Sequence, residues 1–253
     1  IVEGVRHGPG YCDVTASALR SGDYPLRPFV TFRLPTLATV QAALPPIVVV
    51  GLLYILAFAV MLAWAARLVP ALKRKPPVFV ALTLLAGGMV AFVQPELAAF
   101  HEIWAGLFIA LSLALRRPGR WVEAAAFGLI AMLIRETAAL YVAVMCAVAW
   151  FEGQRREAVG WAATVAVLAV VVVLHARAVA EVVTPLDPAS PGWSGLLGPG
   201  FFVTTLAVST ALMLAPLWLA AILVGLSLVG WASWRDPLAL RALAVFLVYG
   251  GLL

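Results

Sequence analysis

Residues able to do chemistry gather near the start of the chain. Tyr11 and Asp13 lie together on a short helix expected over residues 11–20. Arg27 and Arg33 follow in an irregular segment that contains prolines. A carboxylate can accept a proton from a hydroxyl group, and the planar guanidinium of arginine pairs with two phosphate oxygens at once. The alternative is an ordinary surface acid, with arginines that anchor the segment to lipid headgroups.

A second group of ionisable residues stands at the start of an apolar stretch. Glu96 is followed closely by His101 and Glu102. Ionisable residues at membrane depth are costly and usually functional, which here indicates binding of a phosphate or a metal ion. The spacing does not match the His-Glu-x-x-His pattern of zinc proteases. The alternative is a helix start at the membrane interface, where the positive end of the helix favours Glu102.

A third group lies between two short apolar stretches. Arg135 and Glu136 are adjacent there, which indicates either a structural ion pair or a binding site near the depth of a lipid headgroup. His175 and Arg177 end another apolar stretch on the same side. Their simplest explanation is that their polar ends reach the membrane interface.

The elements that must position these residues are expected to be membrane-spanning helices. The chain has 253 residues, of which 64% are hydrophobic and 11% charged, with a mean hydropathy of +1.04. A soluble domain is closer to half apolar and a quarter charged. Uncharged stretches of about 20 residues are long enough to cross a bilayer as helices. We therefore predict an all-α, polytopic bundle with eight spans at 46–68, 78–94, 99–115, 121–134, 137–151, 159–176, 201–231 and 239–253.

The charges outside these spans predict an orientation. One side holds 11 of the 17 basic residues with only four acids, so the positive-inside rule makes it cytoplasmic. Its connections are expected to be tight and to carry simple basic anchors. These anchors explain the net charge of +5, so no nucleic-acid partner is expected. The opposite, extracytoplasmic side is expected to hold 1–44, 95–98, 135–136 and 177–200.

Two parts follow from this plan. Residues 1–44 form a first extracytoplasmic loop with short amphipathic helices, and 45–253 form the transmembrane bundle with an outer loop at about 177–200. The chain starts in polar sequence without a methionine and ends inside an apolar stretch, so we expect a fragment of a longer membrane protein. Cys12 and Cys146 give no disulfide or metal-binding pattern.

The first loop resembles that of the polyprenol-phosphate-dependent glycosyltransferases of the GT-C fold, such as protein mannosyltransferases and lipid A aminoarabinose transferases. Those families have a tyrosine, a short helix of small residues, Ser-Gly-Asp with an aromatic residue, and a later proline before the next span. They also carry an acidic pair before the tyrosine, where this chain has His7 and Gly8. The matching residues are Tyr11, Ser21, Gly22, Asp23, Tyr24 and the run Arg33-Leu34-Pro35.

The resemblance implies a membrane glycosyltransferase that transfers a sugar from a polyprenyl-phosphate donor to an extracytoplasmic acceptor, with inversion. Asp13, the nearest acid beside the tyrosine, would be the catalytic base, and arginines would stabilise the leaving phosphate. No metal ligand is assigned, although a divalent metal ion is compatible with this chemistry. The expected location is a bacterial inner membrane, with membrane lipid as a partner. The residues expected to bind substrate are Tyr11, Arg27, Arg33, Glu96, His101, Glu102, Arg135, Glu136, His175 and Arg177.

Two other classes of function remain open from the sequence. A transporter or flippase of lipid-linked or small substrates predicts polar residues near the middle of several spans. The expected spans are nearly free of charge, which counts against that class. A non-catalytic membrane scaffold predicts no concave polar cavity on the outer face.

Overall fold

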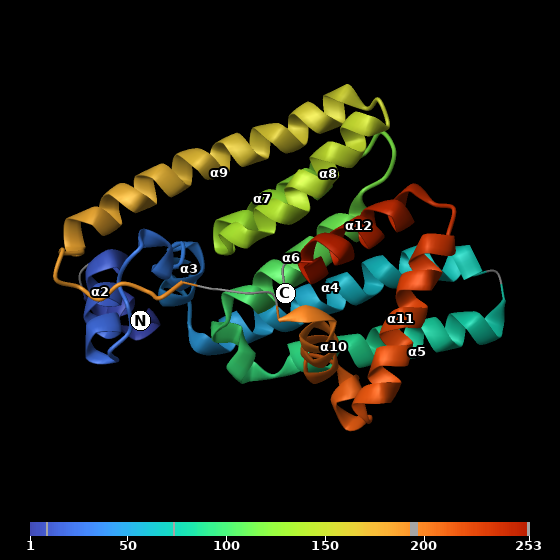
Figure 1. Ribbon diagram of the computed structural model, residues 1–253, viewed down its shortest axis with the longest axis horizontal. Coiled ribbons are helices and arrows are strands. Elements are labelled where there is room, and N and C mark those ends of the chain that lie inside the picture. The colour runs from blue at the N-terminus through green and yellow to red at the C-terminus, as the bar shows by residue number, and fades with distance from the viewer. Residues whose placement is uncertain (9, 73, 193–196, 252–253) are drawn as a thin grey trace.

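The chain is folded entirely into helices and connections. The computed structural model describes residues 1–8, 10–72, 74–192 and 197–251, and these residues contain no β-strand (Figure 1). Alanine and leucine, which dominate the apolar stretches, are strong helix formers. The expectation of an all-helical fold is confirmed for the described residues.

The N-terminal helices form a cap at one end of the molecule (Figure 1). The cap comprises α1 (Val2–His7), α2 (Tyr11–Ser21), the 3-10 helix η1 (Phe29–Thr31) and α3 (Thr36–Ala43). Arg6 ties α1 to the end of α3, because its guanidinium donates to the carbonyl oxygens of Ala42 at 3.2 Å and Leu44 at 2.9 Å. The cap therefore packs as a unit instead of being an open loop.

Two helices are long and apolar enough to cross a bilayer. They are α4 (Pro46–Leu72) and α9 (Arg155–Val182), with 27 and 28 residues. At about 1.5 Å of rise per residue, each is about 40 Å long. Shorter apolar helices accompany them: α5 (Lys75–Met89), α6 (His101–Leu115), α7 (Val122–Ile134) and α8 (Ala139–Phe151), with the 3-10 helices η2 (Val90–Val93), η3 (Pro95–Ala99) and η4 (Glu136–Ala138).

Helices α6 to α9 form the packed centre of the molecule. Trp161 on α9 and Tyr141 on α8 are fully buried, and their rings meet edge-to-face with centroids 5.9 Å apart. Gly128 on α7 allows this close approach, since a Cβ there would lie 2.9 Å from the indole ring. The hydroxyl of Ser112 on α6 lies 2.7 Å from that of Tyr141 and donates to the carbonyl oxygen of Ala124, so both buried hydroxyls are satisfied.

The expected span over 201–231 is wrong as a single helix. The chain instead forms α10 (Gly198–Val208), a 3-10 turn η5 (Ala211–Leu214) and α11 (Leu217–Ser233), before α12 (Pro237–Gly251). The Thr210 side chain accepts from the Leu212 N–H and starts η5. Pro216 then stands at the start of α11, where its missing N–H is tolerated. Local side-chain and proline signals therefore outweigh the continuous apolar pattern.

The outer loop expected at 177–200 also starts later. Helix α9 continues to Val182. Arg177 therefore belongs to the helix and not to the loop, and its side chain is exposed. The described part of the following connection, 183–192, returns to the cap. There the Leu26 N–H donates to the Pro188 carbonyl oxygen at 3.0 Å, and the Ser190 N–H donates to that of Arg27 at 2.7 Å.

Charged side chains are buried at the opposite end of the bundle. The Arg116 guanidinium pairs with Glu157 through two contacts of 3.0 and 2.9 Å, and both side chains are 2% exposed. Arg241, which is completely buried, pairs with both carboxylate oxygens of Glu152 at 2.8 and 2.6 Å. The expectation of simple basic anchors on this side is therefore wrong for Arg116 and Arg241.

Candidate functional site

Four charged side chains from three separate segments meet between the cap and the bundle. Arg33 precedes α3, Glu102 lies in the first turn of α6, and Arg135 and Glu136 form the turn between α7 and α8. The Arg135 Nη1 donates to Glu136 Oε1 at 2.8 Å, and its Nε lies 3.1 Å from Glu102 Oε1. The Arg33 guanidinium lies 3.8 Å from Glu102 and 3.9 Å from Glu136. We call these four residues the arginine–glutamate cluster.

Local backbone geometry fixes two of its members. Arg135 leaves the end of α7 in an extended conformation, and Glu136 begins η4 directly afterwards. Tyr249 on α12 donates from its hydroxyl to the Thr137 carbonyl oxygen at 3.0 Å, which holds this turn against the bundle. Glu102 stands at the N-terminus of α6, where the helix dipole stabilises a carboxylate.

Several polar atoms at the cluster lack hydrogen-bond partners. Among the described residues, His101 Nε2, Arg135 Nε and Glu136 Oε2 are buried without one. Within the described residues the Arg33 guanidinium makes only the two long ionic contacts, and its side chain is 42% exposed. Buried polar groups normally have hydrogen-bond partners, so three buried atoms without one, at the cluster and at the neighbouring His101, indicate a site able to receive a polar ligand.

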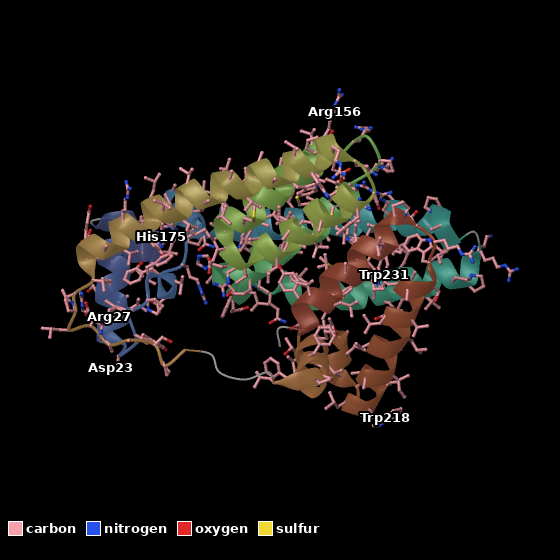
Figure 2. The ribbon with its side chains drawn as sticks, turned by 45° about the horizontal axis from the view of Figure 1, so that its top comes forward. Asp23, Arg27, Arg156, His175, Trp218 and Trp231 are labelled. Carbon is pink, nitrogen blue, oxygen red and sulfur yellow. The ribbon has the colours of Figure 1, made fainter. Side chains whose placement is uncertain are left out.

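Tyr11 and His175 hold the segment that carries Arg33. The Tyr11 hydroxyl donates to the Arg33 carbonyl oxygen at 2.8 Å, and His175 Nε2 lies 3.2 Å from the Phe32 carbonyl oxygen. His175 lies near the cap end of α9, whereas Arg156 lies at its other end (Figure 2). Burial raises the pKa of the Tyr11 phenol, so the hydroxyl remains a donor at neutral pH. Both side chains therefore support the site from its cap side.

Asp13 faces a different hollow, between α2 and α9. This hollow has a volume of about 630 Å³ and is lined by Asp13, Tyr11, His175 and Glu181, among others. Among the described residues, the Asp13 carboxylate has no hydrogen-bond or ion-pair partner. The structure thus places Asp13 beside Tyr11, as the sequence suggests, but not with the cluster that contains Arg33.

Three other residues expected in the site lie elsewhere. The Arg27 Nε donates to the Asp187 carbonyl oxygen at 2.8 Å, which makes Arg27 a structural link to the 183–192 connection. Glu96 lies in η3 and Arg177 on α9, and neither forms an ion pair in the described part of the chain.

A buried acid that the sequence analysis missed reinforces this connection. Arg20 donates to both carboxylate oxygens of Asp187 at 2.8 Å each, and the Thr184 N–H donates to Asp187 Oδ2 at 2.7 Å. The Arg20 hydrogen bonds hold the pKa of Asp187 well below its usual range. The spacing of Thr184 and Asp187 marks a turn, but nothing local in the sequence identifies Arg20 as the partner.

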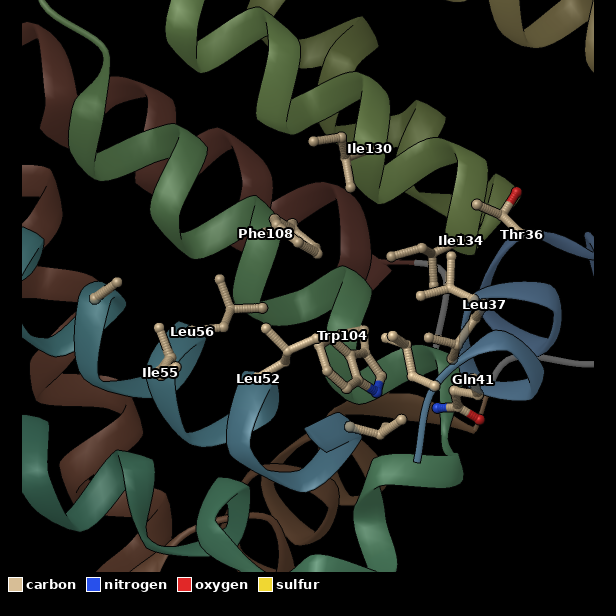
Figure 3. A pocket seen from close by; sticks show the side chains of 14 residues that line it. Thr36, Leu37, Gln41, Leu52, Ile55, Leu56, Trp104, Phe108, Ile130 and Ile134 are labelled. Carbon is tan, nitrogen blue, oxygen red and sulfur yellow. The ribbon is translucent and has the colours of Figure 1, made fainter. Parts of the chain in front are cut away.

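An apolar groove begins beside the cluster and runs between α3, α4, α6 and α7. It has a volume of about 380 Å³, and Figure 3 shows its lining side chains. Thr36 and Ile134 line one end, and they are close in sequence to Arg33 and Arg135. Trp104 lies one helical turn after His101 and lines the same groove. The groove and the arginine–glutamate cluster therefore adjoin.

The groove offers almost no polar contacts. Its lining is aliphatic and aromatic apart from Thr36 and Gln41, and the Gln41 amide donates to the Ala98 carbonyl oxygen. Chemically, such a groove suits a hydrocarbon chain, while the adjoining cluster suits an anion.

No cluster of three or more His, Cys, Asp or Glu side chains suited to a metal ion occurs within residues 1–8, 10–72, 74–192 and 197–251. Compared with protein-family models, curated proteins and solved structures, the chain matches none.

Proposed function

We propose that this chain belongs to a multi-pass membrane glycosyltransferase that uses a polyprenyl-phosphate sugar as donor and acts on the extracytoplasmic face. The observation that carries the proposal is the meeting of Arg33 and Arg135 beside an apolar groove. A lipid-phosphate donor needs this pairing, since it combines one anionic group with a long hydrocarbon chain.

The two arginines would bind the phosphate. Guanidinium groups pair with phosphate oxygens through charge-assisted hydrogen bonds, which are about twice as strong as neutral ones. Arg33 has donors available for this purpose, because among the described residues its guanidinium makes only long ionic contacts, to Glu102 and Glu136. Arg135 approaches from the other side on a turn fixed by Glu136 and by the packing of α7 against α8.

The apolar groove would take the first part of the polyprenyl chain. Burial of hydrocarbon stabilises binding by about 0.8 kcal/mol for each CH₂ group. Leu37, Leu52, Ile55, Phe108 and Ile134 offer such a surface. A free sugar phosphate has no group that would fill this groove, which favours a lipid-linked donor.

The outer surface of the helices supports insertion in a membrane. Large apolar side chains such as Ile47 and Phe58 on α4, and Val170 and Leu174 on α9, are exposed. Monomeric soluble proteins rarely expose apolar patches of that extent. Two helices have the length and composition of full spans, and the other apolar helices would complete the bundle. By the positive-inside rule, the arginine–glutamate cluster would then lie on the extracytoplasmic side.

The reaction would be a single displacement. The acceptor hydroxyl attacks the anomeric carbon while the bond to the phosphate oxygen breaks, so the anomeric centre inverts. A carboxylate takes the hydroxyl proton, and the arginines stabilise the charge on the departing lipid phosphate. The chain's own residues thereby supply an anion site and a base, and the membrane supplies the route for the lipid.

Binding of farnesyl phosphate to the protein in nanodiscs tests the proposal, with farnesol as the matched lipid without phosphate. Each charge-assisted hydrogen bond is worth about 1.5–3 kcal/mol. We therefore expect Arg33→Gln and Arg135→Gln to weaken farnesyl phosphate binding about tenfold or more, with little effect on farnesol. Arg156→Gln, an exposed arginine at the far end of α9, is the control and should bind as the wild type does.

Two results would refute the proposal. A wild-type protein that binds farnesol as tightly as farnesyl phosphate has no phosphate site. A protein that binds farnesyl phosphate but transfers no sugar from farnesyl-phosphate hexoses or pentoses is a lipid-phosphate carrier and not a transferase.

A further inference from the structure

We propose that Glu102 is the proton acceptor of this site, and that phosphate binding frees it for this role by displacing it from Arg135. The inference rests on the proposed function and names the base within it. It assigns the role to a residue on α6, outside the N-terminal loop that carries Asp13.

The contacts of the two glutamates differ in kind. The Glu136 carboxylate receives a hydrogen bond of 2.8 Å from Arg135 Nη1 and is 29% exposed. Glu102 lies 3.1 Å from Arg135 Nε, but that nitrogen makes no hydrogen bond to any described residue, and the Glu102 side chain is 53% exposed. Its contact with Arg33 is longer still, at 3.8 Å. Glu102 is therefore the more weakly held anion of the cluster.

Charge balance makes one glutamate leave when a phosphate arrives. Without ligand, the two positive charges of Arg33 and Arg135 are balanced by the two negative charges of Glu102 and Glu136, through the ion pairs described above. A phosphate bound by both arginines would occupy the position of an existing carboxylate, and two anions about 4 Å apart repel each other. The weakly held, exposed Glu102 is the one able to rotate away.

Release places the carboxylate where a base is needed. Rotation away from the arginines would carry the carboxylate toward the face of the anomeric carbon opposite the phosphate, where the attacking hydroxyl must lie for the centre to invert. Glu102 stays anchored in the first turn of α6, and its carboxylate is exposed, so an acceptor hydroxyl can reach it. Asp13 is not connected to the phosphate site in this way, since no described hydrogen bond or ion pair joins it to Arg33 or Arg135.

The step balances in atoms and charge. The acceptor oxygen forms a bond to the anomeric carbon, and its proton moves to a Glu102 oxygen. The bond between the anomeric carbon and the phosphate oxygen breaks, and its electron pair stays on the lipid phosphate held by Arg33 and Arg135. Glu102 then loses the proton to solvent and returns to Arg135 when the lipid phosphate leaves.

The test is the variant Glu102→Gln, measured by farnesyl phosphate binding in nanodiscs. Removal of the competing anion should tighten binding about fivefold, which corresponds to about 1 kcal/mol for unit charges about 4 Å apart in water. Farnesol binding should not change. Asp23→Asn is the control, because it removes one negative charge from an exposed residue of the cap and should leave binding unchanged. A gain in affinity cannot result from misfolding.

The second measurement is the rate of sugar transfer, with the farnesyl-phosphate sugar that the wild type uses fastest as donor. A general base contributes about 10²–10⁴-fold, so Glu102→Gln should lose at least about 100-fold in turnover. Glu136→Gln, which removes the same charge from the better-held carboxylate, should lose far less.

The outcomes separate the two proposals. Unchanged or weaker farnesyl phosphate binding by Glu102→Gln, or equal losses of transfer in the two glutamate variants, would overturn the role of Glu102. A wild type that neither prefers farnesyl phosphate to farnesol nor transfers a sugar would instead overturn the proposed function.

Discussion

The buried ion pair between Arg116 and Glu157 gives the sharpest prediction about stability. The two side chains are 2% exposed and meet through two hydrogen bonds of 3.0 and 2.9 Å. Loss of one partner leaves the other charged and buried, which typically costs about 3–5 kcal/mol. Replacement of both by apolar residues of similar volume costs much less, because no charge is then stranded.

The surroundings predict which single substitution costs more. Without Glu157, Arg116 still donates to the Gln154 side-chain oxygen at 2.8 Å and lies 3.7 Å from Glu152. Without Arg116, the one hydrogen bond to the Glu157 carboxylate that remains within the described part of the chain comes from the Trp161 indole N–H at 3.2 Å. We therefore expect Arg116→Met to cost about 5 kcal/mol and Glu157→Leu about 3 kcal/mol.

A double-mutant cycle in mixed detergent micelles measures these values. Unfolding by increasing SDS, followed by tryptophan fluorescence, gives the free energy of unfolding for the wild type, Arg116→Met, Glu157→Leu and the double variant. The loss of unfolding free energy in the double variant should be smaller than the sum of the two single losses by at least about 2 kcal/mol. Single losses below about 1 kcal/mol, or strictly additive losses, would refute the role given to this pair.

Two further predictions concern the cap connection and the helix packing. Because the pKa of folded Asp187 lies below its unfolded value of about 3.9, the ionised carboxylate favours the folded state, and this stabilisation is complete above about pH 5 and lost as the pH falls below about 4. The melting temperature of the wild type should therefore exceed that of Asp187→Asn by a constant amount from pH 8 to 5 and by less at lower pH; a gap that widens on acidification would contradict this. A Cβ at Gly160 on α9 would overlap the Trp121 ring, so Gly160→Ala should cost about 1–3 kcal/mol of unfolding free energy. Its control, Gly106→Ala on α6, meets no atom within 4 Å and should gain up to about 1 kcal/mol; equal effects of the two substitutions would count against the packing described for Gly160.

Much of the local structure follows from the sequence because its causes are local. The helix over 11–20 is α2, which has the expected start, and α3 begins at Thr36. The tight turn at Arg135 and Glu136 likewise separates two short helices, as their spacing predicts. Apolar composition, turn residues and prolines act within a few positions, so they can be read without knowledge of the fold.

The partners of the charged residues depend on the tertiary structure alone. Arg33 meets Glu102 and Glu136 although about 70 and 100 residues separate them, and Arg116 meets Glu157 across about 40. A basic residue in a short connection looks the same in the sequence whether it ends as an anchor or as a buried ion.

The residues expected to form one site are thus divided by the fold. The sequence by itself determined that the chain is helical, strongly apolar and rich in ionisable residues near Tyr11, His101 and Arg135. Only the packing of α6, α7 and the cap decided that Arg33, Glu102, Arg135 and Glu136 come together while Asp13 faces another hollow. The reason is physical: helix formation is set by neighbours in sequence, whereas the pairing of charges is set by which helix faces pack together.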